Sequence, residues 1–233
     1  MATKKEILKE MGIDVWQEKT KTKTAKATNA NHNEGCTIIE EAAPVNSQDF
    51  IDLKKQVLSC ALCELHKTRT NVVFGVGCER AEIMFIGEAP GANEDLQGEP
   101  FVGRAGMLLN AMLQAINLKR ADVYIANILK CRPPNNRDPS PQEVKLCTPY
   151  LQQQIAIIQP KILVAVGRIA AQFLLNTVEA MGRLRGKIYQ YGPRNVPLVV
   201  TYHPAYLLRS PSEKKKAYED FLLIKKMITA LPG

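Results

Sequence analysis

The segment IMFIGEAPGANED, residues 83–95, decides the fold because its character changes at the midpoint. A short apolar strand ends at Gly87, and a carboxylate, a proline between small residues, a second glycine and two more acids follow. Gly87 and Gly91 let the backbone turn sharply and approach a ligand closely, while Pro90 stiffens the turn. This turn therefore indicates a binding site whose negative charge restricts the ligand.

Three further short apolar runs follow the first strand, at residues 123–127, 162–167 and 198–202. Helical patterns lie between the runs, at residues 105–118, 141–159 and 168–175. The middle helix has a strong start signal, since Ser140 can cap it, Pro141 suits its first position and Glu143 completes a capping box. Apolar strands that alternate with helices predict a parallel sheet buried on both faces. We therefore expect an α/β domain of three layers, α/β/α, with a central four-stranded parallel sheet.

The 233 residues divide by composition into three parts. Residues 1–16 have the pattern of a short amphipathic helix that ends at the chain's only tryptophan, and residues 17–48 have the polar composition of a disordered linker. The folded domain is expected at residues 49–233 and begins with a helix. No run approaches the roughly 18 apolar residues of a membrane span, and the charged start lacks the apolar core of a secretion signal. These features predict a cytoplasmic protein that does not cross a membrane.

The charge is concentrated in the predicted domain. The formal net charge is +8, and the first 48 residues contain seven lysines and seven acids, so the excess lies in residues 49–233. A basic folded domain favours a polyanionic partner such as nucleic acid.

Four of the six cysteines form a pattern. A C-x-x-C pair is followed by two more cysteines far along the chain, and the set is Cys60, Cys63, Cys131 and Cys147. Structural disulfides are not expected in a cytoplasmic chain, and we interpret Cys36 and Cys78 as small buried side chains. Zinc and an iron–sulfur cluster both accept four cysteine ligands, and the spacing leaves the choice between them open.

Unusual residues follow the end of each predicted strand. The four segments, in chain order, are GEAPGANED, KCRPPNNR, GR and HPAYLLR. In an open parallel sheet the carboxyl ends of all strands face one edge, and ligands bind at that edge. Four segments that are far apart in sequence are therefore predicted to form one cleft.

The first turn could in principle be a phosphate-binding loop, because glycine-rich turns after a strand often bind phosphate. It carries Glu88, Glu94 and Asp95 but no Lys or Arg, and it lacks both G-x-G-x-x-G and G-x-x-x-x-G-K-[ST]. A phosphate would be repelled there, whereas a neutral ring with hydrogen-bonding edges would not.

Other candidate residues lie near the same edge. Phe101 can pack in the core or stack on a ring, Asn127 offers a donor and an acceptor side by side, and His203 follows the last strand. Several cations suit a phosphate backbone as a group, namely Arg104, Lys130, Arg132, Arg137, Arg168 and Arg209.

The motifs GEAPGANED, PFVGRAG, NILKCRPPNNR and HPAYLLR, with the four-cysteine spacing, resemble the family-four (type-4) uracil-DNA glycosylases, the iron–sulfur type. The resemblance covers about residues 49–230. It implies an enzyme that flips uracil out of DNA and hydrolyses the N-glycosidic bond, which leaves an abasic site and initiates base excision repair. It also implies a [4Fe–4S] cluster on the four cysteines, and uracil as the ligand against the first turn.

The resemblance assigns roles by position. Phe101 would stack on uracil, Asn127 would pair with its N3–H and O4, and Glu94 would lie beside C5, where the methyl group of thymine would clash. Glu88, Ala89 and Pro90 would line the pocket. His203 would donate to uracil O2 as negative charge develops there. Contacts with DNA are implied for Arg104, Lys130 and Arg132, while Leu207, Leu208 and Arg209 would fill or brace the gap left in the duplex.

The position that holds the water-orienting residue differs from the wider superfamily. Better-known members have an Asp there, whereas this chain has Ala89. Glu88 is therefore our first candidate for orienting water or stabilising the sugar cation, with Asp95 behind it. Some relatives carry an inserted basic loop whose histidine traps the sugar covalently. Between Phe101 and Leu109 this chain has only VGRAGML, so we expect turnover.

Two other functional classes compete with this interpretation. An iron–sulfur electron carrier with a nucleotide cofactor is disfavoured by the acidic first turn, and a DNA-binding module without turnover is disfavoured by Asn127 and His203. We expect a monomer. Residues 1–16 weakly resemble the start of the psi subunit of the bacterial clamp loader, so they are predicted to bind a replication or repair protein.

Overall fold

The structure, a computed structural model, describes residues 47–231. In this range the chain forms one six-stranded sheet in the order β1-β3-β2-β4-β6-β5. The strands are β1 (Val76–Gly77), β2 (Ile83–Gly87), β3 (Tyr124–Asn127), β4 (Ile162–Val166), β5 (Ile188–Tyr191) and β6 (Val196–Thr201). The predictions for residues 1–16 and for nearly all of the linker lie outside the described residues.

Helices connect the strands. The α-helices are α2 (Ser47–Leu58), α3 (Ala92–Gln97), α4 (Arg104–Ala115), α5 (Pro141–Ile158), α6 (Arg168–Leu175), α7 (Met181–Leu184), α8 (Pro204–Arg209) and α9 (Lys214–Thr229). Short 3-10 helices are η1 (Glu64–Lys67), η2 (Arg120–Asp122), η3 (Pro134–Asn136) and η4 (Pro211–Glu213). Among residues 47–231, no helix is both long and apolar enough to cross a membrane.

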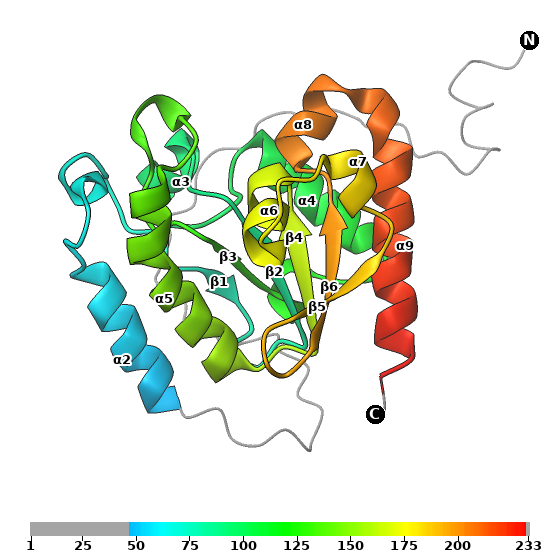
Figure 1. Ribbon diagram of the computed structural model, residues 1–233, viewed down its shortest axis with the longest axis horizontal. Helices are drawn as coiled ribbons and strands as arrows, with labels where there is room; N and C mark the ends of the chain where they lie inside the picture. Colours follow the sequence, from blue (N-terminus) through cyan, green and yellow to red (C-terminus); the bar gives the residue numbers. More distant parts are fainter. Residues whose placement is uncertain (1–46, 232–233) are drawn as a thin grey trace, which may run out of the picture. The chain divides into compact units, whose positions relative to one another are not determined.

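The predicted three layers are confirmed, because helices pack on both faces of the sheet (Figure 1). Alternate residues of β2 divide between the two faces, since side chains of a strand point to opposite sides. Met84 and Ile86 pack with α2, α5 and α6, whereas Ile83 and Phe85 pack with α4 and α9. All the residues of β2, β3 and β4 are buried, as expected for strands covered on both faces.

The four predicted parallel strands form the centre of the sheet. β2 pairs in parallel with β3 and β4, and β4 pairs in parallel with β6. Two antiparallel edge strands were not predicted, β1 beside β3 and β5 beside β6. The predicted start of α5 is confirmed: the Glu143 N–H donates to Ser140 Oγ at 3.3 Å, and the Ser140 N–H donates to Glu143 Oε2 at 2.8 Å.

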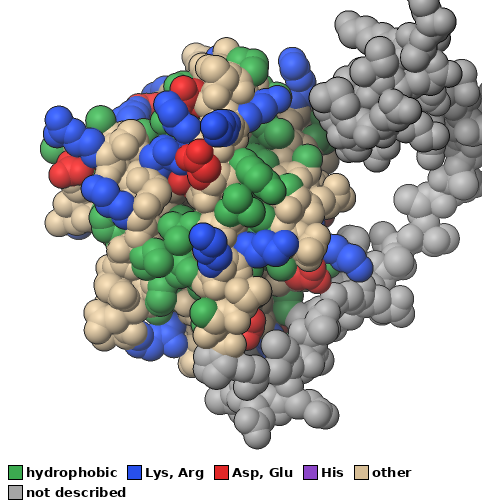
Figure 2. Space-filling view, turned by 90° about the vertical axis from the view of Figure 1, so that its right-hand side faces the viewer, with side chains coloured by type: hydrophobic (Ala, Val, Ile, Leu, Met, Phe, Trp, Pro, Cys, Tyr) green, Lys and Arg blue, Asp and Glu red, His purple; other side chains and the backbone are tan. Residues whose placement is uncertain are grey.

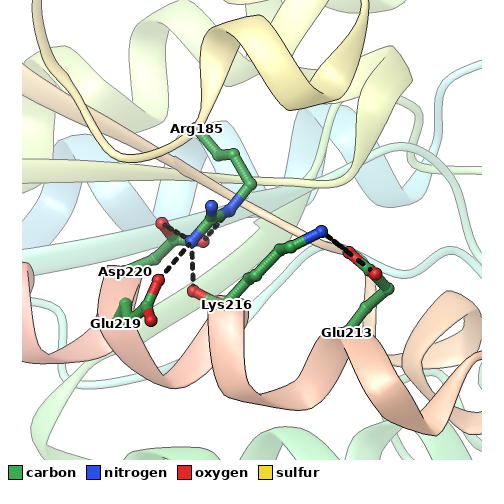
Figure 3. Close-up of polar contacts among 5 residues, drawn as sticks. All are labelled: Arg185, Glu213, Lys216, Glu219 and Asp220. Atoms are coloured by element: carbon green, nitrogen blue, oxygen red, sulfur yellow. Dashed lines mark hydrogen bonds and ion pairs between the residues drawn. The ribbon is translucent and has the colours of Figure 1, made fainter.

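A buried ion pair holds α9 against the segment that follows α7 (Figure 3). Arg185 donates to both oxygens of Asp220, with its Nη2 2.9 Å from Oδ1 and its Nε 3.2 Å from Oδ2. The guanidinium also lies over the ring of Tyr202, 5.6 Å from the ring centroid. Because Tyr202 directly precedes His203, this ion pair supports the end of β6 at the edge where the site lies.

Candidate active site at the carboxyl edge of the sheet

The ends of β2 and β3 lie side by side, with Gly87 paired with Asn127 in the parallel ladder. A Cβ atom at Gly87 would lie 2.4 Å from Asn127 Oδ1 and 2.8 Å from Phe101 Cζ. Only glycine therefore leaves room for both side chains over the strand end, which explains the abrupt end of the apolar run. Two of the predicted site residues meet here.

The amide of Asn127 is the polar group that faces this space. The residue is 2% exposed, and its side chain has no hydrogen-bond partner among residues 47–231. The amide is not fully sealed from solvent, because neither of its polar atoms is both completely buried and unpaired. A nearly buried amide normally has partners, so its unpaired edge indicates a ligand site.

Phe101 is held in an unusual backbone conformation. Its φ is 52°, in the left-handed region that bulky residues rarely adopt, and the residue is 6% exposed. Its carbonyl oxygen accepts from Arg120 Nη1 at 3.2 Å, and the neighbouring carbonyl of Pro100 accepts from Arg120 Nη2. A Cβ atom at Gly106 would lie 1.8 Å from the Phe101 carbonyl oxygen. Sequence reasoning missed these two supporting residues, and strain of this kind is concentrated at functional sites.

Two acids of the first turn brace the neighbouring loops. Glu94 Oε1 accepts from the N–H of Val102 at 3.0 Å and from the N–H of Gly103 at 3.3 Å, directly after Phe101. Asp95 is buried, and its Oδ1 accepts from the N–H of Thr70 at 2.9 Å. The carboxylate of Asp95 is thus engaged with backbone, which leaves Glu88 as the better candidate for contact with water.

His203 is placed by its own helix and by a glycine. Its Nδ1 accepts from the N–H of Ala205 at 3.1 Å, so the imidazole caps α8. A Cβ atom at Gly167, whose φ is +96°, would lie 2.9 Å from His203 Cβ. The imidazole and the Phe101 ring have centroids 5.4 Å apart and planes inclined by 31°. Phe101, Asn127 and His203 therefore converge on the ends of β2, β3 and β6, as predicted for one cleft.

The electrostatics of His203 favour a neutral ring. Burial and the positive charge of Arg209 lower its pKa to about 4, while the negative charge of Glu94 opposes the shift. Because Nδ1 accepts a backbone hydrogen bond, the proton of the neutral imidazole lies on Nε2. The site therefore presents a neutral N–H donor at ordinary pH.

Glu88 is half-buried at the start of the first turn, beside Ala89, while Pro90 is buried. Burial and the negative charge of Asp138 raise the pKa of Glu88 to about 7, and Arg168 opposes the shift. A carboxyl group with such a pKa changes charge near neutral pH, as general bases and electrostatic stabilisers often do.

The four predicted cysteine ligands line one pocket and are free thiols. Arg69 Nη1 donates to Cys131 Sγ at 3.1 Å, and the Lys130 N–H donates to Cys147 Sγ at 3.3 Å. Among residues 47–231, no group of three or more His, Cys, Asp or Glu side chains is arranged to hold a metal ion. Cys78 is buried as expected, but it is disulfide-bonded, which corrects the expectation of a chain without disulfides.

The predicted DNA contact by Lys130 is wrong for this structure. The residue is 1% exposed, and its Nζ donates to the carbonyl oxygen of Asn127 and to Gln154 Oε1. Burial lowers the pKa of Lys130 to about 8, while Cys147 and Cys131 oppose the shift. An ammonium enclosed in this way cannot reach a phosphate.

The predicted gap filler Leu207 is also corrected. It is 1% exposed because it packs with Tyr202 and Ala217 under α8, whereas Leu208 is half-buried and Arg209 is exposed. Arg104 is exposed at the start of α4, and Arg132 is half-buried with its Nε bonded to Asn136 Oδ1 at 2.8 Å. On the face drawn in Figure 2, Lys and Arg side chains are dense near the upper rim, toward the α8 end of the domain.

Comparisons with known proteins agree with this geometry. The sequence model of the Uracil DNA glycosylase superfamily matches residues 74–224. A type-4 uracil-DNA glycosylase of Archaeoglobus fulgidus is 50% identical over 177 residues, which are 73% of this chain and 88% of the relative. A type-4 enzyme of Sulfurisphaera tokodaii is 46% identical over 182 residues, 75% of this chain and 83% of the relative. A type-5 uracil-DNA glycosylase of Pyrobaculum aerophilum is 28% identical over 142 residues, 54% of this chain and 62% of the relative. The chain therefore belongs to the uracil-DNA glycosylase superfamily and, within it, to the type-4 enzymes.

Proposed function

We propose that this protein is a monofunctional uracil-DNA glycosylase that flips uracil out of DNA and hydrolyses its N-glycosidic bond, which initiates base excision repair. The observation that carries the proposal is the convergence of the Phe101 ring, the unpaired Asn127 amide and the neutral His203 imidazole over glycine-lined strand ends. This combination suits a flat, neutral ring with hydrogen-bonding edges. Family membership supports the same substrate and reaction.

Recognition of the base divides among three side chains. Phe101 stacks on the uracil ring, and the strained backbone beneath it fixes the stacking plane. Asn127 pairs with N3–H and O4, whereas cytosine presents the opposite donor and acceptor pattern. Glu94 lies beside C5 and excludes the methyl group of thymine, while its Oε1 also holds the backbone after Phe101 in place.

His203 stabilises the charge that develops as the glycosidic bond breaks. Uracil leaves with its electron pair, so negative charge grows on O2 in the transition state. A neutral Nε2–H donor held by the cap on α8 stabilises that charge without a proton transfer. Because the donor is already oriented, little reorganisation is needed at the moment of reaction.

The other half of the reaction requires water and a stabilised sugar cation. Glu88 serves this purpose in its ionised form, since Asp95 is engaged with backbone and Ala89 offers no polar group. A carboxylate beside the cleft can orient the attacking water and stabilise positive charge on the sugar. The product is an abasic site, and the enzyme turns over.

A [4Fe–4S] cluster fits the four-cysteine pocket. Four free thiols line it, and two hydrogen bonds already point at sulfurs. Zinc also accepts four cysteines, and the similarity to the type-4 enzymes favours the cluster. Cys60, Cys63, Cys131 and Cys147 would hold the cluster. Bound there, the cluster would tie the segment before β1 to the loop after β3, which carries Arg132.

Three further properties complete the proposal. The enzyme acts in the cytoplasm as a monomer, and exposed cations near the site, among them Arg104 and Arg209, contact the DNA backbone. Residues 1–16 recruit it to a replication or repair protein. Deletion of residues 1–48 should leave excision on short oligonucleotides nearly intact and abolish capture of that partner.

The test is incubation of the purified chain with a uracil-containing oligonucleotide, followed by alkali, which cleaves abasic sites. We expect cleavage at the uracil position and none in a matched oligonucleotide with thymine there. Binding without cleavage would instead identify a damage sensor. Iron and acid-labile sulfide should accompany the active protein, and an active protein loaded with zinc alone would refute the cluster.

A further inference from the structure

Lys130 is enclosed in the domain although lysine is rarely buried. Its Nζ donates to the carbonyl oxygen of Asn127 at 2.8 Å and to Gln154 Oε1 at 2.6 Å. The Nε2 of Gln154 donates in turn to the carbonyl oxygen of Phe74 at 2.9 Å and to the Tyr124 hydroxyl at 3.2 Å. The ammonium therefore connects the backbone of Asn127 to a buried chain of hydrogen bonds that continues through Gln154.

The charge of this lysine lacks a carboxylate partner among the described residues, since both of its acceptors are neutral oxygens. A buried ammonium with only neutral acceptors is costly, and a negative group nearby would offset that cost. Lys130 lines the same pocket as the four cysteines, and its own N–H donates to Cys147 Sγ. Thiolates around a bound cluster would supply the missing negative charge.

We propose that Lys130 is a positioning residue that links the four-cysteine pocket to the base site around Asn127. Its charge faces the thiolate-bound group, and its ammonium fixes the peptide of Asn127. The proposal rests on the proposed function, because it takes Asn127 to read uracil and the cysteines to bind a cluster. The carbonyl that Lys130 holds belongs to the residue whose amide faces the base. A rotation of that peptide would displace the amide, and small displacements in a site are costly to rate.

The consequence is that the cluster supports base recognition without any cysteine touching the base. Two hydrogen bonds keep the segment after β3 against β2, from the N–H of Ile128 to the Gly87 oxygen and from the N–H of Leu129 to the Glu88 oxygen, each 3.0 Å long. The ammonium of Lys130 closes this turn, since it donates to the carbonyl oxygen of Asn127 three residues earlier. Damage to the cluster side of the turn therefore reaches the base site.

The test is Lys130→Met in the full-length, cluster-loaded enzyme. Methionine keeps an unbranched apolar stem of similar length but removes the charge and the donors. We expect single-turnover uracil excision to fall about ten- to a hundred-fold with DNA affinity unchanged. The reduction potential of the cluster should become more negative, because a nearby positive charge is lost. Lys226→Met, on the exposed side of α9, is the matched control and should change neither quantity.

Gln154→Leu separates positioning from charge, and it serves also if Lys130→Met does not fold. It removes one acceptor of Lys130 but keeps the ammonium, so excision should fall while the potential stays at the wild-type value. An unchanged potential in Lys130→Met, or excision at the wild-type rate in Gln154→Leu, would overturn the proposal. Wild-type enzyme without excision would instead refute the proposed function, so the two failures are distinguishable.

Discussion

The proposed base site, formed by Phe101, Asn127 and His203, and the four-cysteine pocket differ in how their hydrogen-bonding groups are used. At the base site the polar groups are left without partners within the described chain: the Asn127 amide is unpaired, and His203 uses only Nδ1 in a hydrogen bond. In the four-cysteine pocket the donors are already assigned, with Arg69 and the Lys130 backbone bonded to sulfurs. We expect a site for a transient ligand to keep its donors and acceptors free. At a site for a permanently bound group, we expect the surrounding donors to be bonded already to the ligating atoms.

The two sites also differ in what supports them. Phe101, Asn127 and His203 are fixed by strand ends, by glycines that leave room, and by the backbone contacts of Arg120 and Glu94. The cysteines come from segments outside the sheet and from α5, and the proposed cluster would hold those segments together. We expect changes in the base site to affect chemistry first, and changes in the four-cysteine pocket to affect stability first.

The largest expected effect is at His203. His203→Asn retains a side-chain oxygen that can cap α8, because Asn is a preferred N-cap residue, but it removes the Nε2–H donor. We expect uracil excision to fall about a hundred- to a thousand-fold, as loss of one such donor does. The thermal unfolding midpoint should stay close to that of the wild type. A rate near the wild-type value would remove His203 from catalysis.

Asn127→Asp should have the next largest effect. The substitution replaces one donor of the reading edge, and a matched base contact contributes about 1–3 kcal/mol of discrimination, so excision of uracil should fall about ten- to a hundred-fold. Cytosine in the same sequence becomes a weak substrate, because a carboxylate can accept from its amino group. Asn176→Asp at the end of α6 is the control and should excise uracil normally. Unchanged uracil excision in Asn127→Asp would show that this residue does not read the base.

The pH dependence should reveal Glu88. If its carboxylate is the working form, a pKa of about 7 means that the single-turnover rate falls as pH decreases below 7, by about tenfold per pH unit. His203 adds no such fall until pH approaches 4. Glu88→Gln should have a lower single-turnover rate at pH 8, and its rate should no longer fall as pH decreases below 7. A pH–rate profile like that of the wild type would exclude Glu88 from catalysis.

The same shift in pKa has a consequence for stability. Because the folded state raises the pKa of Glu88 above its ordinary value of 4.5, the folded protein binds that proton more tightly than the unfolded chain does. The contribution of Glu88 to the unfolding free energy is therefore fully present below pH 4.5 and decreases as pH rises through about 7. Glu88→Gln should reduce this decrease, as measured by denaturant unfolding at pH 5 and pH 8.

The smallest expected effect is at the exposed Arg209. Arg209→Gln should weaken DNA binding a few-fold for all sequences and reduce the salt dependence, so that the slope of log K against log salt becomes shallower by about 0.9. Lys226→Gln, in the last turn of α9, also removes one positive charge and should leave the slope unchanged. Equal slopes in the two variants would place Arg209 away from the DNA backbone.

Much of the fold could be predicted because its signals are local. Apolar runs mark the four parallel strands, and Ser140 with Glu143 marks the start of α5. The edge strands were missed for physical reasons. β1 has two residues, and β5 is half-exposed, so neither forms a continuous apolar run.

Site residues that lie at or just after the end of an apolar run could be predicted from the sequence. Residues whose position depends on contacts with distant parts of the chain could not. Asn127 and His203 directly follow apolar runs, so the sheet topology brings them together. Lys130 was assigned to DNA because lysine is usually exposed, and only the three-dimensional structure reveals its enclosure. Leu207 and Leu208 are adjacent in a short helix, and composition does not decide which of the two faces inward.

The most direct test of catalytic uracil excision is to count products from a duplex with one uracil under conditions of excess substrate. We predict one free uracil per abasic site, many turnovers per enzyme molecule, no strand cleavage before alkali, and strongly reduced release of uracil by His203→Asn. Release of no uracil, or equal release by wild type and His203→Asn, would contradict the proposed function.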